Sequence, residues 1–106
     1  MLPTKRLRQF SRSMAYRIRF KRKALKQLDA LYQYIAEGNP ESGRKILERV
    51  HVVFVRLGLF PLLGHPSDEG AVHVLVVGKT GLLIFYTFNT DTVTIVRILH
   101  ERQERN

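Results

Sequence analysis

The feature that most restricts the fold of this chain is a pair of apolar runs near its C-terminus. The runs are Leu82–Phe88 and Val93–Leu99, and both are rich in β-branched and aromatic residues. The four residues between them, 89–92, are turn formers. This pattern predicts a β-hairpin. The second run contains Arg97 and leads into His100, so the segment that builds core also delivers polar groups to one edge.

A strand and two helices precede the hairpin. Residues 16–20 alternate apolar and basic side chains, which predicts a strand with one buried face. From residue 21 the apolar residues recur at helical spacing, and Gly38 is predicted to end this helix in the left-handed conformation that glycine tolerates. Asn39 and Pro40 then predict the start of a second helix, with Asn39 as its N-cap, which ends near Gly58.

The remaining segments complete the order of elements. Residues 59–70 are punctuated by Pro and Gly, which predicts a loop; residues 71–77 form a further strand and residues 78–81 a turn. The order is β-α-α-β-β-β, and the short connection between the helices makes them antiparallel neighbours. We therefore predict an α+β fold, in which a helical hairpin packs on a mainly antiparallel four-stranded sheet.

Two of the predicted strands are apolar on both faces. In residues 71–77, Val74 and Val76 on one side are as apolar as Leu75 and Val77 on the other. Two helices cover only one face of such a sheet, and strands that are apolar on both faces usually have both covered. We expect the second face to meet a partner. The alternative is that sheet twist and the loop of residues 59–70 cover it.

The positive charge is concentrated at the N-terminus. Residues 1–26 carry ten of the 18 Lys and Arg residues and none of the nine acidic ones, so the rest of the chain is close to neutral. Such a block favours DNA, RNA or an acidic protein. Residues 1–15 are predicted to be a basic, poorly ordered extension: a solvated tail, a transit-peptide-like leader or an addition upstream of Met14. Residues 16–106 form a single domain.

Several classes of site and location are not expected. The chain has no cysteine, so disulfides and thiolate metal sites are ruled out. No apolar run approaches the roughly 20 residues that span a bilayer, so we expect a soluble, cytoplasmic protein without a membrane partner. No metal or cofactor is expected, because there is no Gly-rich phosphate loop and the histidines lack metal-ligand spacing.

Three segments carry a resemblance to a known family. They are residues 57–65 (LGLFPLLGH), 83–86 (LIFY) and 96–102 (VRILHER). Together they resemble the RelE/ParE toxin superfamily of bacterial type II toxin–antitoxin systems, closest to the ParE or plasmid-stabilisation branch. The resemblance covers residues 16–105.

The resemblance implies a compact toxin that is neutralised by a small cognate antitoxin, whose tail wraps the toxin surface. Members of the ParE branch are associated with inhibition of DNA gyrase, whereas members of the RelE branch cut mRNA on the ribosome. Operator DNA would be contacted only through the antitoxin, and the toxin would form a homodimer or a hetero-oligomer with its antitoxin. A third possibility is a degenerate, non-toxic member that only binds its antitoxin.

The residues favour binding over catalysis. RNA cleavage of the RelE type needs groups that activate the 2′-hydroxyl, protonate the leaving oxygen and stabilise the phosphate. The RelE branch supplies them with Arg, Lys and a terminal Tyr, but residues 82–87 hold no cation and no Tyr follows the last run. If the chain is an enzyme, it is an endoribonuclease, and its candidate catalytic residues are His73, Tyr86 and His100. Structural roles are the alternative for both histidines.

A basic edge at the end of the last run is the predicted binding surface. It consists of Arg97, His100, Arg102 and Arg105, with Tyr86 as the aromatic neighbour. These side chains suit an acidic antitoxin tail, a surface of gyrase or nucleic acid. A solvated, charged terminus is the alternative.

Overall fold

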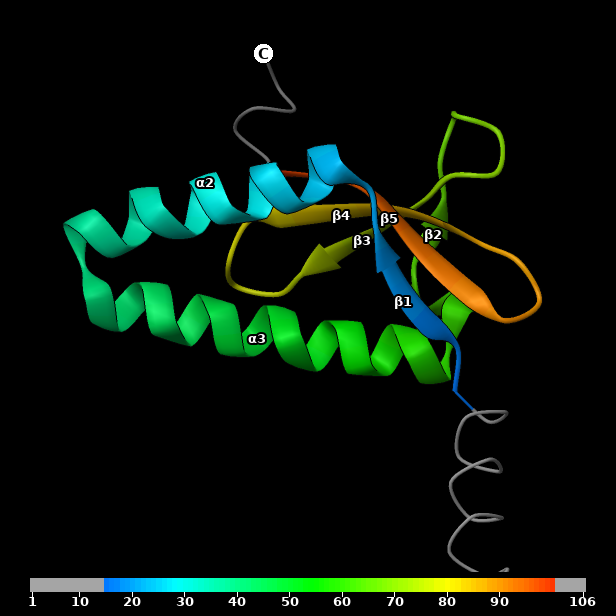
Figure 1. Cartoon of the computed structure of the whole chain (residues 1–106), viewed down its shortest axis with the longest axis horizontal. Coiled ribbons are helices and arrows are strands. Elements are labelled where there is room, and N and C mark those ends of the chain that lie inside the picture. Colours follow the sequence, from blue (N-terminus) through cyan, green and yellow to red (C-terminus); the bar gives the residue numbers. More distant parts are fainter. Residues whose placement is uncertain (1–14, 101–106) are drawn as a thin grey trace, which may run out of the picture.

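The computed structural model describes residues 15–100, which form a helical hairpin packed on one face of a twisted sheet (Figure 1). Except for residue 15, the predicted N-terminal extension lies outside the described residues. The elements are β1 (Arg17–Phe20), α2 (Arg22–Gly38), α3 (Pro40–Leu59), the 3-10 helix η1 (Pro61–Leu63), β2 (His65–Pro66), β3 (His73–Val77), β4 (Leu82–Phe88) and β5 (Thr92–His100).

The sheet has the strand order β1-β5-β4-β3-β2. Strand β1 runs parallel to β5, and the other neighbours are antiparallel, which confirms the mainly antiparallel α+β prediction. The predicted count of four strands is wrong. The segment taken for a loop contains η1 and the strand β2, whose residue His65 pairs with Val74. Two residues are too few to show an alternating pattern, so the sequence did not reveal this strand.

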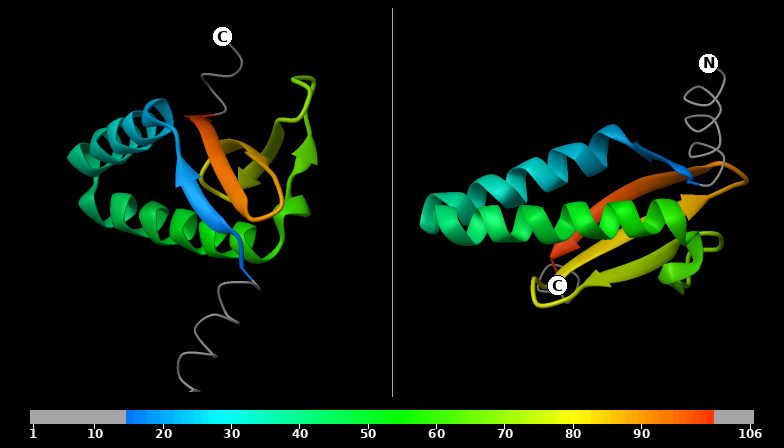
Figure 2. Two further views of the ribbon diagram at one scale, coloured as in Figure 1. Left: turned by 45° about the vertical axis from the view of Figure 1, so that its right-hand side comes forward. Right: turned by 90° about the horizontal axis from the view of Figure 1, so that it is seen from below.

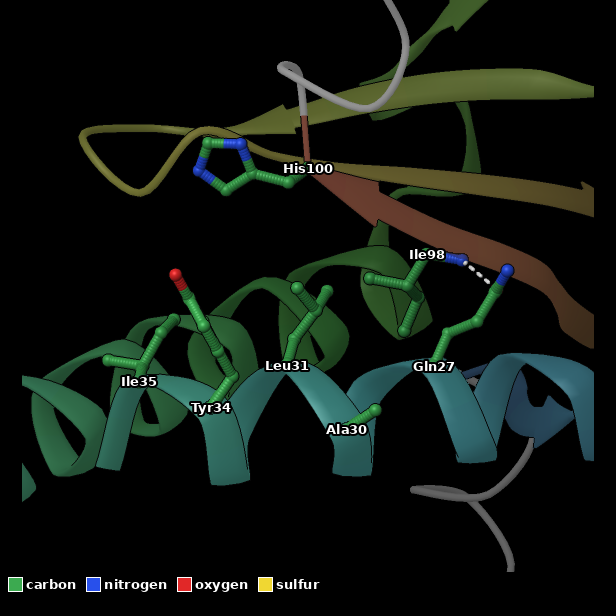
Figure 3. Close-up of a pocket in the computed structure, with 7 residues that line it drawn as sticks. All are labelled: Gln27, Ala30, Leu31, Tyr34, Ile35, Ile98 and His100. Carbon is green, nitrogen blue, oxygen red and sulfur yellow. Dashed lines mark hydrogen bonds between the residues drawn. The ribbon is translucent and has the colours of Figure 1, made fainter. Parts of the chain in front are cut away.

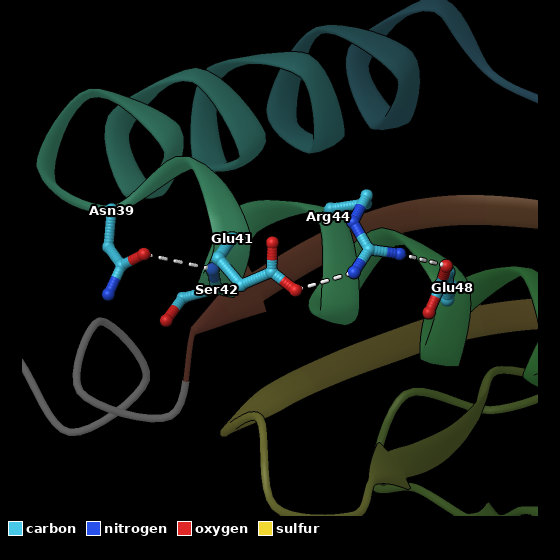
Figure 4. A network of polar contacts seen from close by, with 5 residues as sticks. All are labelled: Asn39, Glu41, Ser42, Arg44 and Glu48. Atoms are coloured by element: carbon cyan, nitrogen blue, oxygen red, sulfur yellow. Dashed lines mark hydrogen bonds and ion pairs between the residues drawn. The ribbon is translucent and has the colours of Figure 1, made fainter.

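The connection between the helices depends on Asn39, as predicted. Its side chain accepts a hydrogen bond from the backbone N–H of Ser42 at 3.2 Å, and Pro40 occupies the first turn of α3. Figure 4 shows this cap beside Arg44, which bridges Glu41 and Glu48 on successive turns. The charges of α3 therefore suit its dipole, with an acid in the first turn and Arg56 in the last.

The prediction that Gly38 adopts a left-handed conformation is wrong. Gly38 is the last residue of α2 and is not among the residues with positive φ. Asn39 follows in an extended conformation, with φ −159°, and its N–H donates to the carbonyl of Ile35. Because the next helix starts at once, the same Asn39 closes α2 and caps α3, and an N-cap requires extended backbone.

The core lies between the helical hairpin and the facing side of the sheet. The two views of Figure 2 show the helices against that face. The ring of Phe20 in β1 meets that of Phe54 in α3 edge to face, with centroids 5.0 Å apart. Strand β1 ends opposite Ile95, so β5 has no strand partner on that edge beyond this point. There the side-chain oxygen of Gln27 accepts the Ile98 N–H, which ties α2 to β5.

The second face of the sheet is partly covered by the chain itself. Phe85 is only 5% exposed on this face, because the guanidinium of Arg97 lies 3.9 Å from its ring centroid. Residues 66–69 line a shallow hollow beside it. Val76 in β3 remains 56% exposed. The loop thus contributes the cover named as the alternative above, but leaves part of β3 bare.

Candidate functional site

The structure places the candidate residues on both faces of the sheet. In the antiparallel ladders His73 pairs with Tyr86, His100 with Leu82 and Arg97 with Phe85. Cross-strand partners share a face, so His73, Tyr86 and His100 lie on the helix-covered face, whereas Arg97 lies on the opposite one.

A β-bulge causes this separation. The partners of β5 step from Arg97, opposite Phe85, to Ile95, opposite Tyr86, which leaves Val96 as an extra residue. Strict alternation would put Arg97 on the same face as Ile95. The bulge allows β5 to bury Ile95 and Ile98 together, three residues apart. This spacing is the sequence signal that could have revealed the bulge.

Tyr86 acts as a structural link between the sheet and η1. Its hydroxyl donates to the carbonyl of Pro61 at 2.7 Å and accepts the backbone N–H of Gly64 at 2.8 Å. The side chain is fully buried. Burial raises the pKa of Tyr86 above its ordinary value of 10.0, and the hydrogen bond from Gly64 opposes that shift. The hydroxyl is therefore neutral at pH 7 and its single proton is engaged by the backbone.

Only glycine fits at residue 64. A Cβ atom there would lie 2.6 Å from the carbonyl oxygen of Val74 and 2.8 Å from the Tyr86 hydroxyl. Pro61 and Gly64 belong to the segment LGLFPLLGH, and Tyr86 belongs to LIFY. Residues from two of the segments that carried the resemblance therefore contact each other in the folded chain. The sequence shows both segments but not that they meet.

His73 contacts the aromatic side of this link. Its ring centroid lies 5.6 Å from that of Tyr86 and 5.2 Å from that of Phe88. Its Nδ1 lies 3.2 Å from the carbonyl oxygen of Ala71. The partially exposed imidazole is therefore held among rings at the start of β3.

His100 lies in a different place, at the end of β5. Together with Ile98 it faces α2 across a cleft of about 460 Å³, which α2 lines with Gln27, Ala30, Leu31, Tyr34 and Ile35 (Figure 3). The cross-strand partners of His73 and His100 are four residues apart on β4, which corresponds to about 13 Å. The two histidines also lie on strands on opposite sides of β4. This separation far exceeds the roughly 3 Å of a hydrogen bond, so the structure does not bring the two rings together at one phosphate.

The turn before β4 accommodates the ring of His100. Gly81 has a φ of +78°, and a Cβ atom on it would lie 2.8 Å from the Nε2 atom of His100. A side chain at residue 81 would displace that ring. Gly81 thus allows both the turn and the position of His100.

Arg97 is held by its own chain. Its guanidinium forms an ion pair with Glu69 at 2.9 Å and stacks on the ring of Phe85. The expectation that Tyr86 is the aromatic neighbour is therefore wrong, because the bulge directs Arg97 to the other face. Arg102 and Arg105 of the predicted basic edge lie outside the described residues.

The sequence did not reveal an exposed apolar surface at the end of α3 and in η1. We call it the α3–η1 apolar surface, and its side chains are between 46% and 74% exposed. It consists of Val52, Val55, Leu59, Phe60 and Leu62. The signal is in residues 51–59 (HVVFVRLGL), which are apolar around most of the helix, a pattern typical of helices that are covered on all sides.

Residues 15–100 contain no cluster of three His, Cys, Asp or Glu side chains that could hold a metal ion. In the same range, no helix has the length and apolar character needed to cross a membrane.

Comparison with protein families decides the class. The family model of the ParE toxin of the ParDE type II toxin–antitoxin system matches residues 18–105. The chain belongs to the ParE toxin family. It is also 27% identical over 88 residues to the Y4kP protein of Sinorhizobium fredii, which is named as a candidate toxin; the match covers 83% of this chain and 91% of that protein.

Solved structures show the same fold as this ParE-family chain. The chromosomal ParDE system of Pseudomonas aeruginosa matches with a TM-score of 0.73 at 22% identity, over 83% of this chain and 97% of the other. The toxin RelE of Escherichia coli in its free state gives 0.64 at 16% identity, over 87% and 90%. A RelBE toxin–antitoxin complex of Mycobacterium tuberculosis gives 0.58 at 22% identity, over 82% and 92%.

Proposed function

We propose that this ParE-family toxin inhibits DNA gyrase by binding to it and that a cognate antitoxin neutralises it. The observation that carries the proposal is that the candidate acid–base groups do not converge. The Tyr86 hydroxyl is engaged by Pro61 and Gly64. His73 and His100 lie on strands on either side of β4, and their partners there are about 13 Å apart along the strand. Arg97 lies on the other face. Inhibition by binding requires no such convergence, and the resemblance to the ParE branch names gyrase as the target.

The target-binding surface in this proposal is the C-terminal end of the chain. It retains Arg97, His100, Arg102 and Arg105, the residues named from the sequence. Arg97 is only 22% exposed at its side chain and paired with Glu69, so the two arginines beyond residue 100 are the better ones to substitute.

The gyrase proposal is tested with purified protein in a DNA supercoiling assay. We expect the wild type to block supercoiling and to trap cleaved DNA on gyrase. We expect Arg102→Gln with Arg105→Gln to weaken inhibition at least about tenfold, the scale of a lost charge-assisted contact. The matched control is Lys45→Gln with Arg56→Gln, which removes the same charge from exposed positions of α3 and should inhibit like the wild type.

A translation assay tests the alternative function, which is mRNA cleavage on the ribosome. The same protein is added to a ribosome-dependent extract, and mRNA ends are mapped by primer extension. Cuts at defined codons, with gyrase unaffected, would replace the gyrase proposal with the endoribonuclease alternative. Inactivity in both assays, with antitoxin binding intact, would indicate a degenerate member.

The antitoxin is proposed to cover the α3–η1 apolar surface. Monomeric soluble proteins rarely expose contiguous apolar patches of more than a few hundred Å². Here five apolar side chains within residues 52–62, at the end of α3 and in η1, are exposed. An antitoxin segment with an apolar stripe would bury them.

The antitoxin proposal is tested by co-purification with the small acidic protein encoded in the adjacent reading frame. We expect Val55→Glu with Leu62→Glu to abolish the complex, because each substitution would bury an unpaired charge. The control is Tyr34→Glu, at a side chain that is 77% exposed on α2 and outside the patch. Retention of the complex by the double variant would place the antitoxin elsewhere.

A further inference from the structure

The described residues contain a dense group of cations on β1 and the start of α2. We call it the β1–α2 basic patch. All its side chains are exposed, and none forms an ion pair with any residue of 15–100. Its members are Arg17, Arg19, Lys21, Arg22, Lys23 and Lys26. The acidic residues closest to it along the chain and the ladder, Asp29 and Asp91, lie beyond its ends.

The two long helices differ in how the charges at their ends match the helix dipole. Helix α3 has an Asn39 side-chain cap, an acid in its first turn and a base in its last. Helix α2 has no side-chain cap, no acid in its first turn and no base in its last. Instead Arg22 and Lys23 stand at the positive end of its dipole. The charges of α2 therefore oppose its own stability, which indicates that they serve an external anion.

The patch follows an edge strand and the start of the helix after it, and the chain turns between the two (Figure 1). Strand β1 is the edge strand of the sheet, so no other strand covers its outer side (Figure 2). Residues 17–21 extend about 13 Å and the first turns of α2 add about 7 Å. One strand of duplex DNA places a phosphate about every 3.4 Å along its axis. Each of the two parts thus spans the separation of a few neighbouring phosphates, and the six cations together offer up to six phosphate contacts.

The patch lacks the aromatic side chains that bind single strands. Phe20 is its aromatic residue, and that ring packs on Phe54 in the core. Proteins that hold single-stranded DNA or RNA stack the bases on exposed aromatic rings. Cations without such rings suit the backbone of a duplex, which is contacted without reading its sequence.

We propose that the β1–α2 basic patch binds the phosphate backbone of double-stranded DNA. The contact is the toxin's own and needs no antitoxin, and it does not rest on the proposal about gyrase. Six phosphate contacts give a salt slope of about −5, so affinity falls about 10³-fold between 50 and 200 mM salt. Affinity is similar for duplexes of different sequence.

The test measures fluorescence anisotropy of a labelled 30-base-pair duplex with the full 106-residue chain. Arg22→Gln, Lys23→Gln and Lys26→Gln are combined in the patch variant. We expect it to bind at least about tenfold more weakly at 100 mM salt, with a salt slope smaller by about 3.

The matched control removes the same charge from elsewhere on the surface. It combines Lys45→Gln, Arg56→Gln and Lys79→Gln, all exposed and outside the patch. We expect less than a twofold change in affinity and an unchanged slope. Equal losses in both triple variants would overturn the proposal, because net charge alone would then explain binding. Tighter binding of a single-stranded DNA or RNA of equal length would overturn the choice of duplex DNA.

A charge reversal separates loss of binding from loss of fold. Arg22→Glu with Lys23→Glu places acids where the dipole of α2 favours them. We expect the thermal unfolding midpoint to rise while DNA binding is lost. A fall of the midpoint together with the loss of binding would show that these residues support the fold, and would contradict the proposal.

Discussion

Replacement of Tyr86 by Phe removes one oxygen atom and both hydrogen bonds that join β4 to η1. The larger effect falls on Gly64, whose buried N–H loses its acceptor, at a cost of about 1–3 kcal/mol. Loss of the bond to Pro61 adds about 0.5–1.5 kcal/mol at most, because that carbonyl is only partly buried. The ring itself keeps its packing. We therefore expect the free energy of unfolding to fall by about 2 kcal/mol.

Urea denaturation followed by circular dichroism measures this change. In a thermal unfolding experiment on a domain of this size, 2 kcal/mol corresponds to a fall in the melting temperature of about 8–16 °C. The matched control is Tyr34→Phe, which removes a hydroxyl from a side chain that is 77% exposed and should change stability by less than about 0.5 kcal/mol.

Two results would refute this account of Tyr86. The first is a loss below about 0.5 kcal/mol, which would show that the two hydrogen bonds do not hold η1 in place. The second is a variant that keeps full stability but no longer inhibits growth. The hydroxyl would then act in function, as the catalytic alternative requires.

The pKa of Tyr86 adds a pH dependence that the same variant isolates. Burial raises this pKa in the folded chain above its value of 10.0 in the unfolded chain. The stabilisation is complete below pH 10 and is lost as the pH rises through the folded pKa, because the unfolded chain releases its proton first. We expect the stability difference between the wild type and Tyr86→Phe to shrink above pH 10. Lysine titration is common to both and cancels; a constant difference would contradict the shift.

Three further predictions concern other single residues, each measured by urea denaturation. Gly64→Ala should destabilise the chain by about 3 kcal/mol, because the new Cβ would meet the backbone oxygen of Val74. Unchanged stability would show that Gly64 does not lie this close to Val74. Asn39→Ala should cost about 1 kcal/mol, the usual value of an N-cap, whereas Asn39→Ser should restore it. Arg22→Glu alone should stabilise the chain by about 0.3–1 kcal/mol at low salt, and the gain should fade as salt is added.

Much of the fold could be predicted from local chemistry. The β-hairpin follows from two β-branched runs around Asn89, whose side-chain oxygen accepts the N–H groups of Asp91 and Thr92. The start of α3 follows from Asn39 and Pro40. Strand β2 could not be predicted, because it consists of two residues that pair only where β3 is already in place.

The α3–η1 apolar surface shows a different limit. The apolar run of residues 51–59 indicates a helix with little polar surface. The run does not show which side of the helix faces the sheet, because valine occurs on the buried side (Val50) and on the exposed side (Val55) alike. Packing decided that Val50 is buried and Val55 exposed. Exposure is a property of neighbours in space, and the sequence of one element does not contain it.

By itself the sequence determined the order of the longer elements, the family and the residues with reactive or charged side chains, but not η1 or β2. The tertiary structure decided which of those residues meet. A single extra residue in β5 turns Arg97 away from Tyr86. The hydroxyl of Tyr86 is hydrogen-bonded by the backbone of Pro61 and Gly64, which are 25 and 22 positions away in the chain. Periodicity tells which side chains share a face within one element. Register and long-range hydrogen bonds form between elements, so only the folded chain fixes them.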